Sequence, residues 1–281
     1  MSNESFDEAH ARSVANRSQS EFSELLAFAQ TLADLSGSAI TPYFRSRLEV
    51  VNKAAAGDFD PVTLADQAAE RVIADAVAAR WPEHGFVGEE HGTTRPDARM
   101  RWVVDPIDGT RAFIMGQPMW GTLIGLLDGD EPVLGVMDQP YTRERFWSDA
   151  TETFVRDARG GTHRITTRAC PQLGDAILST THPDLLGAGH EVESFARLKS
   201  KVRMTRYGGD CYSYCLLAAG FIDLVVEAGL KPFDIVALIP IIERAGGCIT
   251  TWDGKPAHQG GRIIAAGDRK LHAQAMAVLA G

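Results

Sequence analysis

One acidic segment of this chain has the residue types and the spacing of a metal site. Asp105 and Asp108 are three residues apart and directly follow the apolar run at 102–104. Since Pro106 fixes its own φ and has no backbone donor, the segment is predicted to form a tight turn that directs both carboxylates to one centre. The carbonyl of Ile107 would add a further oxygen, and an all-oxygen ligand set suits Mg²⁺ or Mn²⁺ rather than zinc.

Gly109 and Thr110 come next and have the properties of a phosphate site. Glycine lets the backbone approach a ligand closely. A helix that starts near Thr110 would offer free N–H groups and a favourable dipole. Metal ligands followed at once by a phosphate cradle indicate phosphoryl transfer. The alternative is an acidic turn that only caps a helix.

Two further acidic groups follow short apolar runs. One is the Gly-Glu-Glu string at 88–90, with Glu89 at its centre, and the other is the segment 231–234, which ends in Asp234. Carboxylates at the end of a buried strand are unfavourable unless they are paired or bind a cation. Either group taken alone is also compatible with a solvated loop.

The elements predicted around these motifs indicate a layered α/β fold. Apolar side chains at three-to-four spacing predict two helices, at 25–40 and 65–77. Brief apolar runs predict strands at 48–51, 86–87, 102–104, 120–127, 132–137 and 145–148. In the second half the elements alternate, with strands at 176–180, 202–207, 222–227, 248–251 and 262–266 and helices at 191–198, 211–219, 233–245 and 269–279.

The 281 residues are enough for one large domain or two ordinary ones. We expect a polar tail at 1–20, a half at 21–155 with the metal and phosphate motifs, and a half at 156–281 with the specificity elements. A net charge of −9 and a pI near 5.4 argue against a nucleic-acid partner. No apolar run is long enough for a membrane span and the polar start has no signal-peptide core, so a cytoplasmic location is expected.

The four cysteines lack the spacing of a metal motif. Cys211 and Cys215 lie one helical turn apart, so a two-ligand metal pair is one interpretation. The other is that all four are small buried thiols in a reducing compartment.

Taken together, the acidic motifs resemble those of the inositol monophosphatase superfamily. The matching strings, in order and at the right spacing from about residue 21 onward, are 88–90, 105–110 with Phe113, and 233–234 with Ala237 and 245–247. The resemblance implies a layered α-β-α-β-α sandwich that forms a homodimer. It also implies two or three Mg²⁺ ions, with Mn²⁺ as an alternative, and a small phosphate monoester as the substrate.

The resemblance also assigns roles by matched position. Glu89, Asp105 and the Ile107 carbonyl would hold one ion, and Asp105, Asp108 and Asp234 would hold a second. Thr110 and Asp66 would orient the attacking water, with Glu89 as a third catalytic residue. Without the resemblance, Asp66 would be interpreted as an exposed carboxylate on its helix. Direct attack by water is favoured over a phosphoenzyme, because the two aspartates are not in an Asp-x-Asp string.

The segments 207–214 and 227–234 are similar to the histidinol-phosphate phosphatase branch. Inositol-specific members usually have a small neutral hydroxyl residue at the position of Asp210. An acidic Asp210 with Glu227 nearby would suit a substrate that carries an ammonium group, as L-histidinol phosphate does. The alternative is that Asp210 caps the helix that begins near Cys211. The predicted substrate-binding residues are Asp108, Gly109, Thr110, Asp210 and Glu227.

Some assignments stay open at this point. Tyr212 and Tyr214 could border the imidazole of the substrate or belong to the core, and Lys53 could contact phosphate or face solvent. Three functions compete: hydrolysis of L-histidinol phosphate in histidine biosynthesis, a broader inositol-1-phosphate, sugar or nucleotide phosphatase, and a non-catalytic relative that binds partners. The first is the leading prediction.

Overall fold

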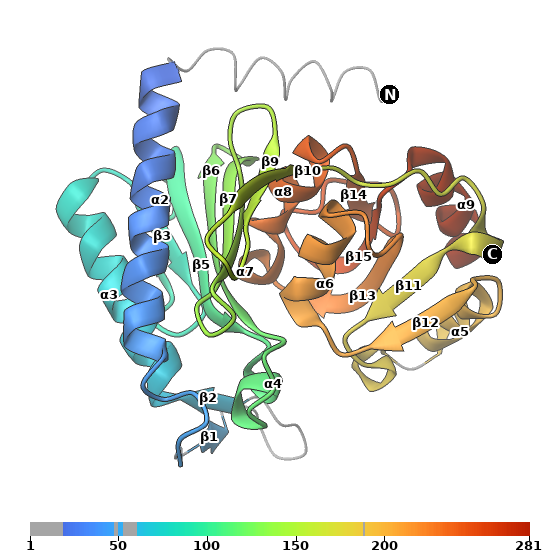
Figure 1. Ribbon diagram of the computed structural model, residues 1–281, viewed down its shortest axis with the longest axis horizontal. Coiled ribbons are helices and arrows are strands. Elements are labelled where there is room, and N and C mark those ends of the chain that lie inside the picture. The colour runs from blue at the N-terminus through green and yellow to red at the C-terminus, as the bar shows by residue number, and fades with distance from the viewer. Residues whose placement is uncertain (1–18, 48–49, 53–60, 188) are drawn as a thin grey trace.

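The computed structural model describes residues 19–47, 50–52, 61–187 and 189–281. Residues 1–18 of the predicted tail, the start of the strand at 48–51 and the loop with Lys53 lie outside these ranges. Five layers follow one another across the molecule (Figure 1): a helix pair, a large sheet, central helices, a small sheet and an outer helix pair. The predicted α-β-α-β-α sandwich is therefore confirmed.

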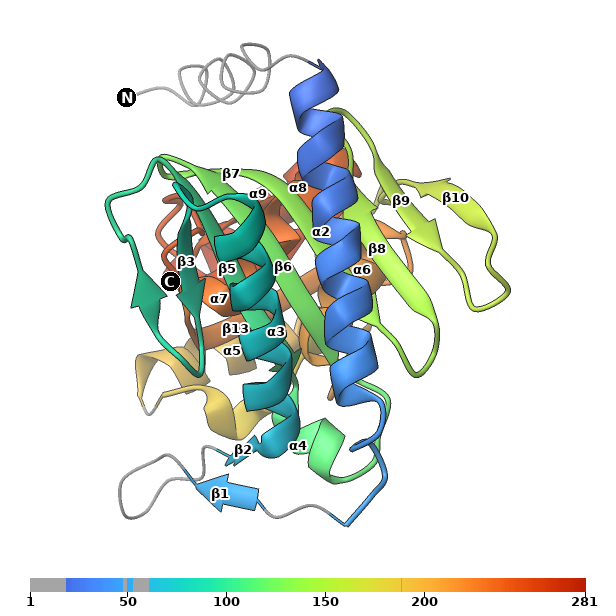
Figure 2. The same ribbon diagram turned by 90° about the vertical axis from the view of Figure 1, so that its left-hand side faces the viewer.

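The first layer consists of α2 (Gln19–Ile40) and α3 (Leu64–Arg80), which lie side by side on one face of the large sheet (Figure 2). As predicted, α2 ends just before the Thr41-Pro42 pair. Thr63 caps α3: its side chain accepts from Ala65 N, and its own N–H donates to the side chain of Asp66. This capping box fixes where α3 begins, and with it the orientation of Asp66.

The large sheet has eight strands in the order β10-β9-β8-β7-β6-β5-β3-β4, and only the β3–β5 pair is parallel. The strands are β3 (Gly85–Gly88), β4 (Thr93–Thr94), β5 (Met100–Asp108), β6 (Gly121–Asp128), β7 (Glu131–Gln139), β8 (Glu144–Ser148), β9 (Thr153–Arg156) and β10 (Thr162–Ile165). A separate hairpin joins β1 (Val50–Asn52) to β2 (Pro61–Thr63). The β9–β10 hairpin was not predicted. It continues the large sheet past residue 155, where the first half of the chain was expected to end. The division into two halves at that residue stays a prediction.

The predicted tight turn at Asp105–Asp108 is wrong, because β5 runs through it. Asp105 pairs with Leu123 and Asp108 with Gly121, so β5 has one more residue than β6 over this stretch. Residues three apart in a regular strand point to opposite faces, and the bulge brings Asp105 and Asp108 to the same side. Pro106 accounts for the irregularity, since it has no N–H for the ladder, and the hydroxyl of Thr122 donates to its carbonyl at 2.8 Å.

The small sheet has the order β12-β11-β13-β15-β14, with β11 parallel to both of its neighbours. Its strands are β11 (Ile177–Thr180), β12 (Met204–Tyr207), β13 (Leu224–Leu230), β14 (Cys248–Thr251) and β15 (Gly261–Ala266). Helices α5 (His190–Lys199) and α9 (Arg269–Ala280) cover its outer face, while α6 (Asp210–Ala218), α7 (Pro232–Ile235) and α8 (Leu238–Arg244) lie between the two sheets (Figure 1).

The single helix predicted at 233–245 is in fact the pair α7 and α8. Pro240 explains the break, because it has no N–H to donate to the carbonyl of Val236 one turn earlier. The short α7 is thereby separated from the packed α8, and it carries Asp234 against β5 and β6 of the large sheet.

Apolar side chains fill the spaces between the layers. One cluster lies between the helix pair and the large sheet, a second between the two sheets around α6 and α8, and a third under α5 and α9. None of the helices in the described ranges is long and apolar enough to cross a membrane.

Candidate active site

Three carboxylates from two layers meet beside the bulge of β5. Asp105 and Asp108 come from β5 and Asp234 from α7, and one oxygen of each lies within 4.8 Å of the others. Asp105 is buried, whereas Asp108 and Asp234 are half-buried. The structure thus brings together three of the predicted metal ligands from segments more than a hundred residues apart in the chain.

The carboxylates of this cluster repel one another in a poorly hydrated place. Burial raises the pKa of Asp105 well above its usual range, and the charges of Glu89 and Asp108 raise it further. Burial together with Asp210 and Asp234 has the same effect on the pKa of Asp108. The pKa of Asp234 rises to about 7, chiefly because of burial. A hard divalent cation would remove this repulsion, and carboxylate oxygens are the ligands that Mg²⁺ prefers.

Glu89 follows β3, which is parallel to β5 with Gly88 opposite Val104, so Glu89 and Asp105 lie at the same end of the two strands. Glu89 is half-buried, and its charge raises the pKa of both Asp105 and Asp234. The remaining expected ligand, the Ile107 carbonyl, accepts a hydrogen bond from the hydroxyl of Thr110 at 3.1 Å. The structure therefore brings Asp105, Asp108 and Asp234 together and places Glu89 after the strand next to β5, and the roles of all the predicted ligands toward a metal remain predictions.

Asp66 is fully buried, so its interpretation as an exposed carboxylate is wrong. One oxygen accepts from the N–H of Thr63 at 2.9 Å and from its hydroxyl at 2.5 Å. The other oxygen is buried without a hydrogen-bond partner among the described residues. Burial raises the pKa of Asp66 to about 7. A carboxylate with that pKa and a free buried oxygen suits a water molecule or a general-base role.

The phosphate segment begins at Gly109, whose φ is +88°. A Cβ at this position would lie 2.8 Å from the Met119 carbonyl oxygen and 3.2 Å from Cβ of Asp210, so only glycine fits. The predicted helix start is confirmed, since α4 (Thr110–Ile114) begins directly after Gly109. It is a single short turn.

Asp210 does not cap α6, so that alternative interpretation is wrong. The N-cap residue is Gly209, and the N–H of Cys211 donates to Oδ2 of Asp108 at 2.6 Å. Asp108, one of the predicted metal ligands, therefore caps the helix that begins with Asp210. The side chain of Asp210 is therefore not used as a helix cap. Its backbone is in the left-handed region, with φ of +44°.

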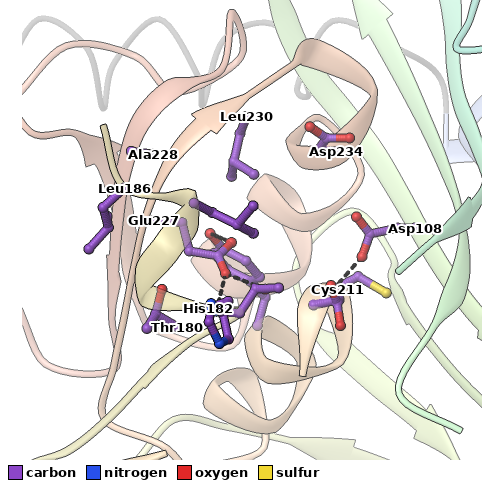
Figure 3. A pocket seen from close by; sticks show the side chains of 13 residues that line it. Asp108, Thr180, His182, Leu186, Cys211, Glu227, Ala228, Leu230 and Asp234 are labelled. Carbon is purple, nitrogen blue, oxygen red and sulfur yellow. Dashed lines mark hydrogen bonds between the residues drawn. The ribbon is translucent and has the colours of Figure 1, made fainter. Parts of the chain in front are cut away.

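A cavity of about 160 Å³ extends from the carboxylate cluster into the second half of the molecule (Figure 3). Asp108 and Asp234 border it on one side and Glu227 on the other. Its remaining lining residues come from the ends of β11 and β13, the start of α6 and the segment after β11: Thr180, Thr181, His182, Leu185, Leu186, Asp210, Cys211, Tyr214, Ala228 and Leu230. No lysine or arginine is among the described residues that line it.

Glu227 is a buried and well-bonded acceptor in this cavity. It accepts from Thr181 N at 2.8 Å, from the Thr181 hydroxyl at 2.6 Å and from the Tyr214 hydroxyl at 2.9 Å. Burial nevertheless raises its pKa. The pKa of Asp210 rises to about 7, first through burial and then through the charge of Glu227, while the charge of Arg111 lowers it. The charge of Glu227 thus affects the pKa of Asp210 within the same cavity.

The two tyrosines of α6 differ. Tyr214 lines the cavity, whereas the hydroxyl of Tyr212 donates to Glu144 and its ring packs edge-on against Phe146. Tyr212 therefore belongs to the core, and only Tyr214 lies where it could border a substrate.

The buried cysteines of α6 are poor candidates for a metal pair. Cys211 and Cys215 are almost fully buried, and burial raises the pKa of both thiols well above their usual range. Thiols that stay protonated do not bind metals well.

Sequence reasoning missed Thr181 and His182, which follow β11. Parallel strands that end at the same edge of a sheet bring the residues after them together, and β11 is paired in parallel with β13. That pairing places Thr181 against Glu227, but it could not be predicted from either segment alone.

A five-layered fold with a carboxylate cluster at the end of a bulged strand and a cavity beside it defines a class of phosphatases. The inositol monophosphatase family model matches residues 21–280, and the chain belongs to this family. It is therefore a phosphoric monoester hydrolase by family.

The chain is similar to curated proteins of two named activities. It is 42% identical to the bifunctional phosphatase IMPL2 of Arabidopsis thaliana, with 94% of this chain and 78% of the plant protein covered. It is 34% identical to a histidinol-phosphatase of Mycobacterium tuberculosis, with 74% and 80% covered. Among solved structures, an inositol monophosphatase from Zymomonas mobilis superposes with a TM-score of 0.82 at 41% identity, covering 92% of this chain and 99% of that one.

Proposed function

We propose that this protein is a Mg²⁺-dependent phosphatase for phosphate esters of cationic amino alcohols, and that L-histidinol phosphate is its substrate. The observation that supports this proposal is the pair of the half-buried Asp210 and the buried Glu227 in a cavity that opens onto the carboxylate cluster. An ammonium group between these two side chains would offset both charges, whereas an uncharged polyol would not.

The cluster residues fit divalent cations: Glu89, Asp105 and the Ile107 carbonyl would hold one, and Asp105, Asp108 and Asp234 would hold a second. When bound, such a cation supplies positive charge to the phosphate and makes a water more nucleophilic. The chain's own groups orient that water: Thr110 accepts a hydrogen bond from it and passes its own proton toward Asp66. This relay requires the Thr110 hydroxyl to turn away from the Ile107 carbonyl, to which it now donates. Attack in line with the ester oxygen breaks the P–O bond, and the departing alkoxide takes up a proton from solvent water and leaves as the alcohol.

A broader substrate range is the second candidate. Two similar proteins support it: IMPL2 is named a bifunctional phosphatase, and the Zymomonas mobilis structure is described as an inositol monophosphatase. Membership of this family also suggests a homodimer, and sedimentation of the purified protein would test it.

The proposal is tested by phosphate release in the presence of Mg²⁺. The substrates are L-histidinol phosphate, inositol 1-phosphate, fructose bisphosphate and adenosine bisphosphate. We expect L-histidinol phosphate to have the highest kcat/KM. Much faster turnover of inositol phosphate would refute the substrate assignment, and no turnover of any ester with Mg²⁺ would refute phosphatase activity itself.

A further inference from the structure

Glu70 is a fully buried carboxylate that the mechanism above does not use. It lies on α3, one turn after Asp66, and its side chain contacts the turn that follows β3. Its Oε2 accepts from Glu90 N at 2.8 Å, and its Oε1 accepts from His91 N at 2.6 Å and lies 3.1 Å from His91 Nδ1. Both oxygens therefore bond to one short stretch of backbone.

The turn is shaped to receive this carboxylate. A Cβ at Gly88 would lie 2.2 Å from Oε1 of Glu70, so the first residue of the Gly-Glu-Glu string must be glycine. The N–H of Gly88 donates to the Gly92 carbonyl at 3.0 Å and closes the turn. The backbone of 88–92 is thus held by its own hydrogen bond and by Glu70.

This turn carries two acidic residues, and because β3 is parallel to β5 with Gly88 opposite Val104, Glu89 follows its strand beside Asp105. Glu89 acts on the pKa of Asp105 and Asp234, and Glu90 acts on that of Asp66. Because Asp66 and Glu70 are on successive turns of α3, one helix positions both the predicted base and the turn with Glu89. A shift of this turn would move Glu89 away from the other ligands.

We propose that Glu70 is a positioning residue that holds Glu89 in the geometry required for divalent-cation binding. It does not contact the cluster itself and acts through the backbone of Glu90 and His91. Hydrogen bonds from N–H groups to a carboxylate are strong and directional, so they suit this task. The inference rests on the proposed metal site, but not on the identity of the substrate.

Glu70→Gln tests the proposal, because it preserves shape but turns one acceptor into an NH₂ donor that faces a backbone N–H. Mg²⁺ affinity is measured by calorimetry without substrate, and thermal unfolding is measured in EDTA. We expect Mg²⁺ binding to weaken about tenfold or more, as when a group that supports a metal ligand is lost. At saturating Mg²⁺, the kcat of the variant should be closer to that of the unchanged protein than its Mg²⁺ affinity is.

The matched control is Asp223→Asn, which changes another fully buried carboxylate. Asp223 accepts from Arg168 and from Ile177 N, away from the cluster. This variant should lower the melting temperature and leave Mg²⁺ affinity unchanged. If Glu70→Gln does not fold, Glu70→Asp, which keeps the charge, replaces it with the same expectation. Unchanged Mg²⁺ affinity in the Glu70 variant, or an equal loss in Asp223→Asn, overturns the proposal. Absence of Mg²⁺ binding by the unchanged protein instead overturns the metal site.

Discussion

The two ends of the cavity hold carboxyl groups in different ways. At the cluster end, Asp105, Asp108 and Asp234 each accept one close backbone N–H, from Ile107, Cys211 and Lys231 respectively, and repel one another. At the other end, Glu227 accepts three hydrogen bonds, from Thr181 and Tyr214. The first end needs a cation to hold its charges together, whereas Glu227 at the second is already fixed before any ligand arrives.

We infer from this difference that the two ends would recognise different parts of one substrate. The cluster end suits a small, doubly charged ion and the phosphate that it would bind. The other end suits a single organic cation, because its acceptors are rigid and its walls include Leu186 and Leu230. Variants at one end should therefore affect metal binding, and variants at the other should affect the choice of alcohol.

Asp105→Asn should have the largest effect. The change removes one charge from the most buried member of the cluster, and we expect kcat to fall by about 10³-fold, the loss typical of a main electrostatic contributor. Phosphate release across a Mg²⁺ titration measures it. Near-normal activity at high Mg²⁺ would contradict the metal site at this end.

Asp210→Ser should act on the choice of alcohol. Loss of one partner of a buried charge pair costs about 2 kcal/mol or more, so kcat/KM for L-histidinol phosphate should fall by about 30-fold or more. The value for inositol phosphate should change much less. Asp210→Asn is the control for charge, since it keeps the size of the side chain and should resemble the serine variant. Equal losses for both substrates would show that Asp210 does not select the amine.

The pH dependence of stability tests the first end without any substrate. In the unfolded chain an aspartate ionises near its ordinary pKa of about 3.9. The folded protein raises the pKa of Asp234 in the cluster to about 7, and it raises those of Asp105 and Asp108 well above their usual range. Between these values the folded state binds more protons, so its stability falls as pH rises. In EDTA the melting temperature should drop by about 5 °C or more from pH 5 to pH 8.

Mg²⁺ should reverse that loss, because it binds the ionised carboxylates. The increase in melting temperature on adding Mg²⁺ should be larger at pH 8 than at pH 5. A melting temperature in EDTA that rises between these pH values would contradict the repulsion inferred at the cluster.

Tyr214→Phe should have the smallest effect. It removes one of the three hydrogen bonds to Glu227, a loss of about 1 kcal/mol, so KM for L-histidinol phosphate should rise by less than about tenfold. Tyr212→Phe is the matched control on the same helix, because Tyr212 faces Glu144 instead of the cavity. Equal effects of the two changes on KM would show that Tyr214 acts only through stability.

The residues of the cluster end could be predicted from the sequence more fully than those of the other end, for a physical reason. Asp105, Asp108 and Gly109 lie within five residues of sequence, so local spacing carries most of their geometry. Even there the bulge was missed, because it depends on the register between β5 and β6. At the other end, the contact of Thr181 with Glu227 depends on strand pairing across 46 residues, which no local pattern contains.

Glu70 is an instructive omission. It falls on the apolar face of α3, together with Ala69, Ile73 and Val77, which are buried. A carboxylate on a buried helix face needs a partner, so the helical periodicity could have identified Glu70 as unusual. What the periodicity could not reveal is the partner, since the turn at 88–91 meets α3 only in the folded chain.

A crystal structure with Mg²⁺, L-histidinol and inorganic phosphate tests the central claim most directly. We predict cations between Asp105, Asp108 and Asp234, with phosphate beside them, and the ammonium group within hydrogen-bonding distance of Asp210 or Glu227. Phosphate bound away from the three aspartates, or an amine directed into solvent, would contradict the division of the cavity into a metal end and an amine end.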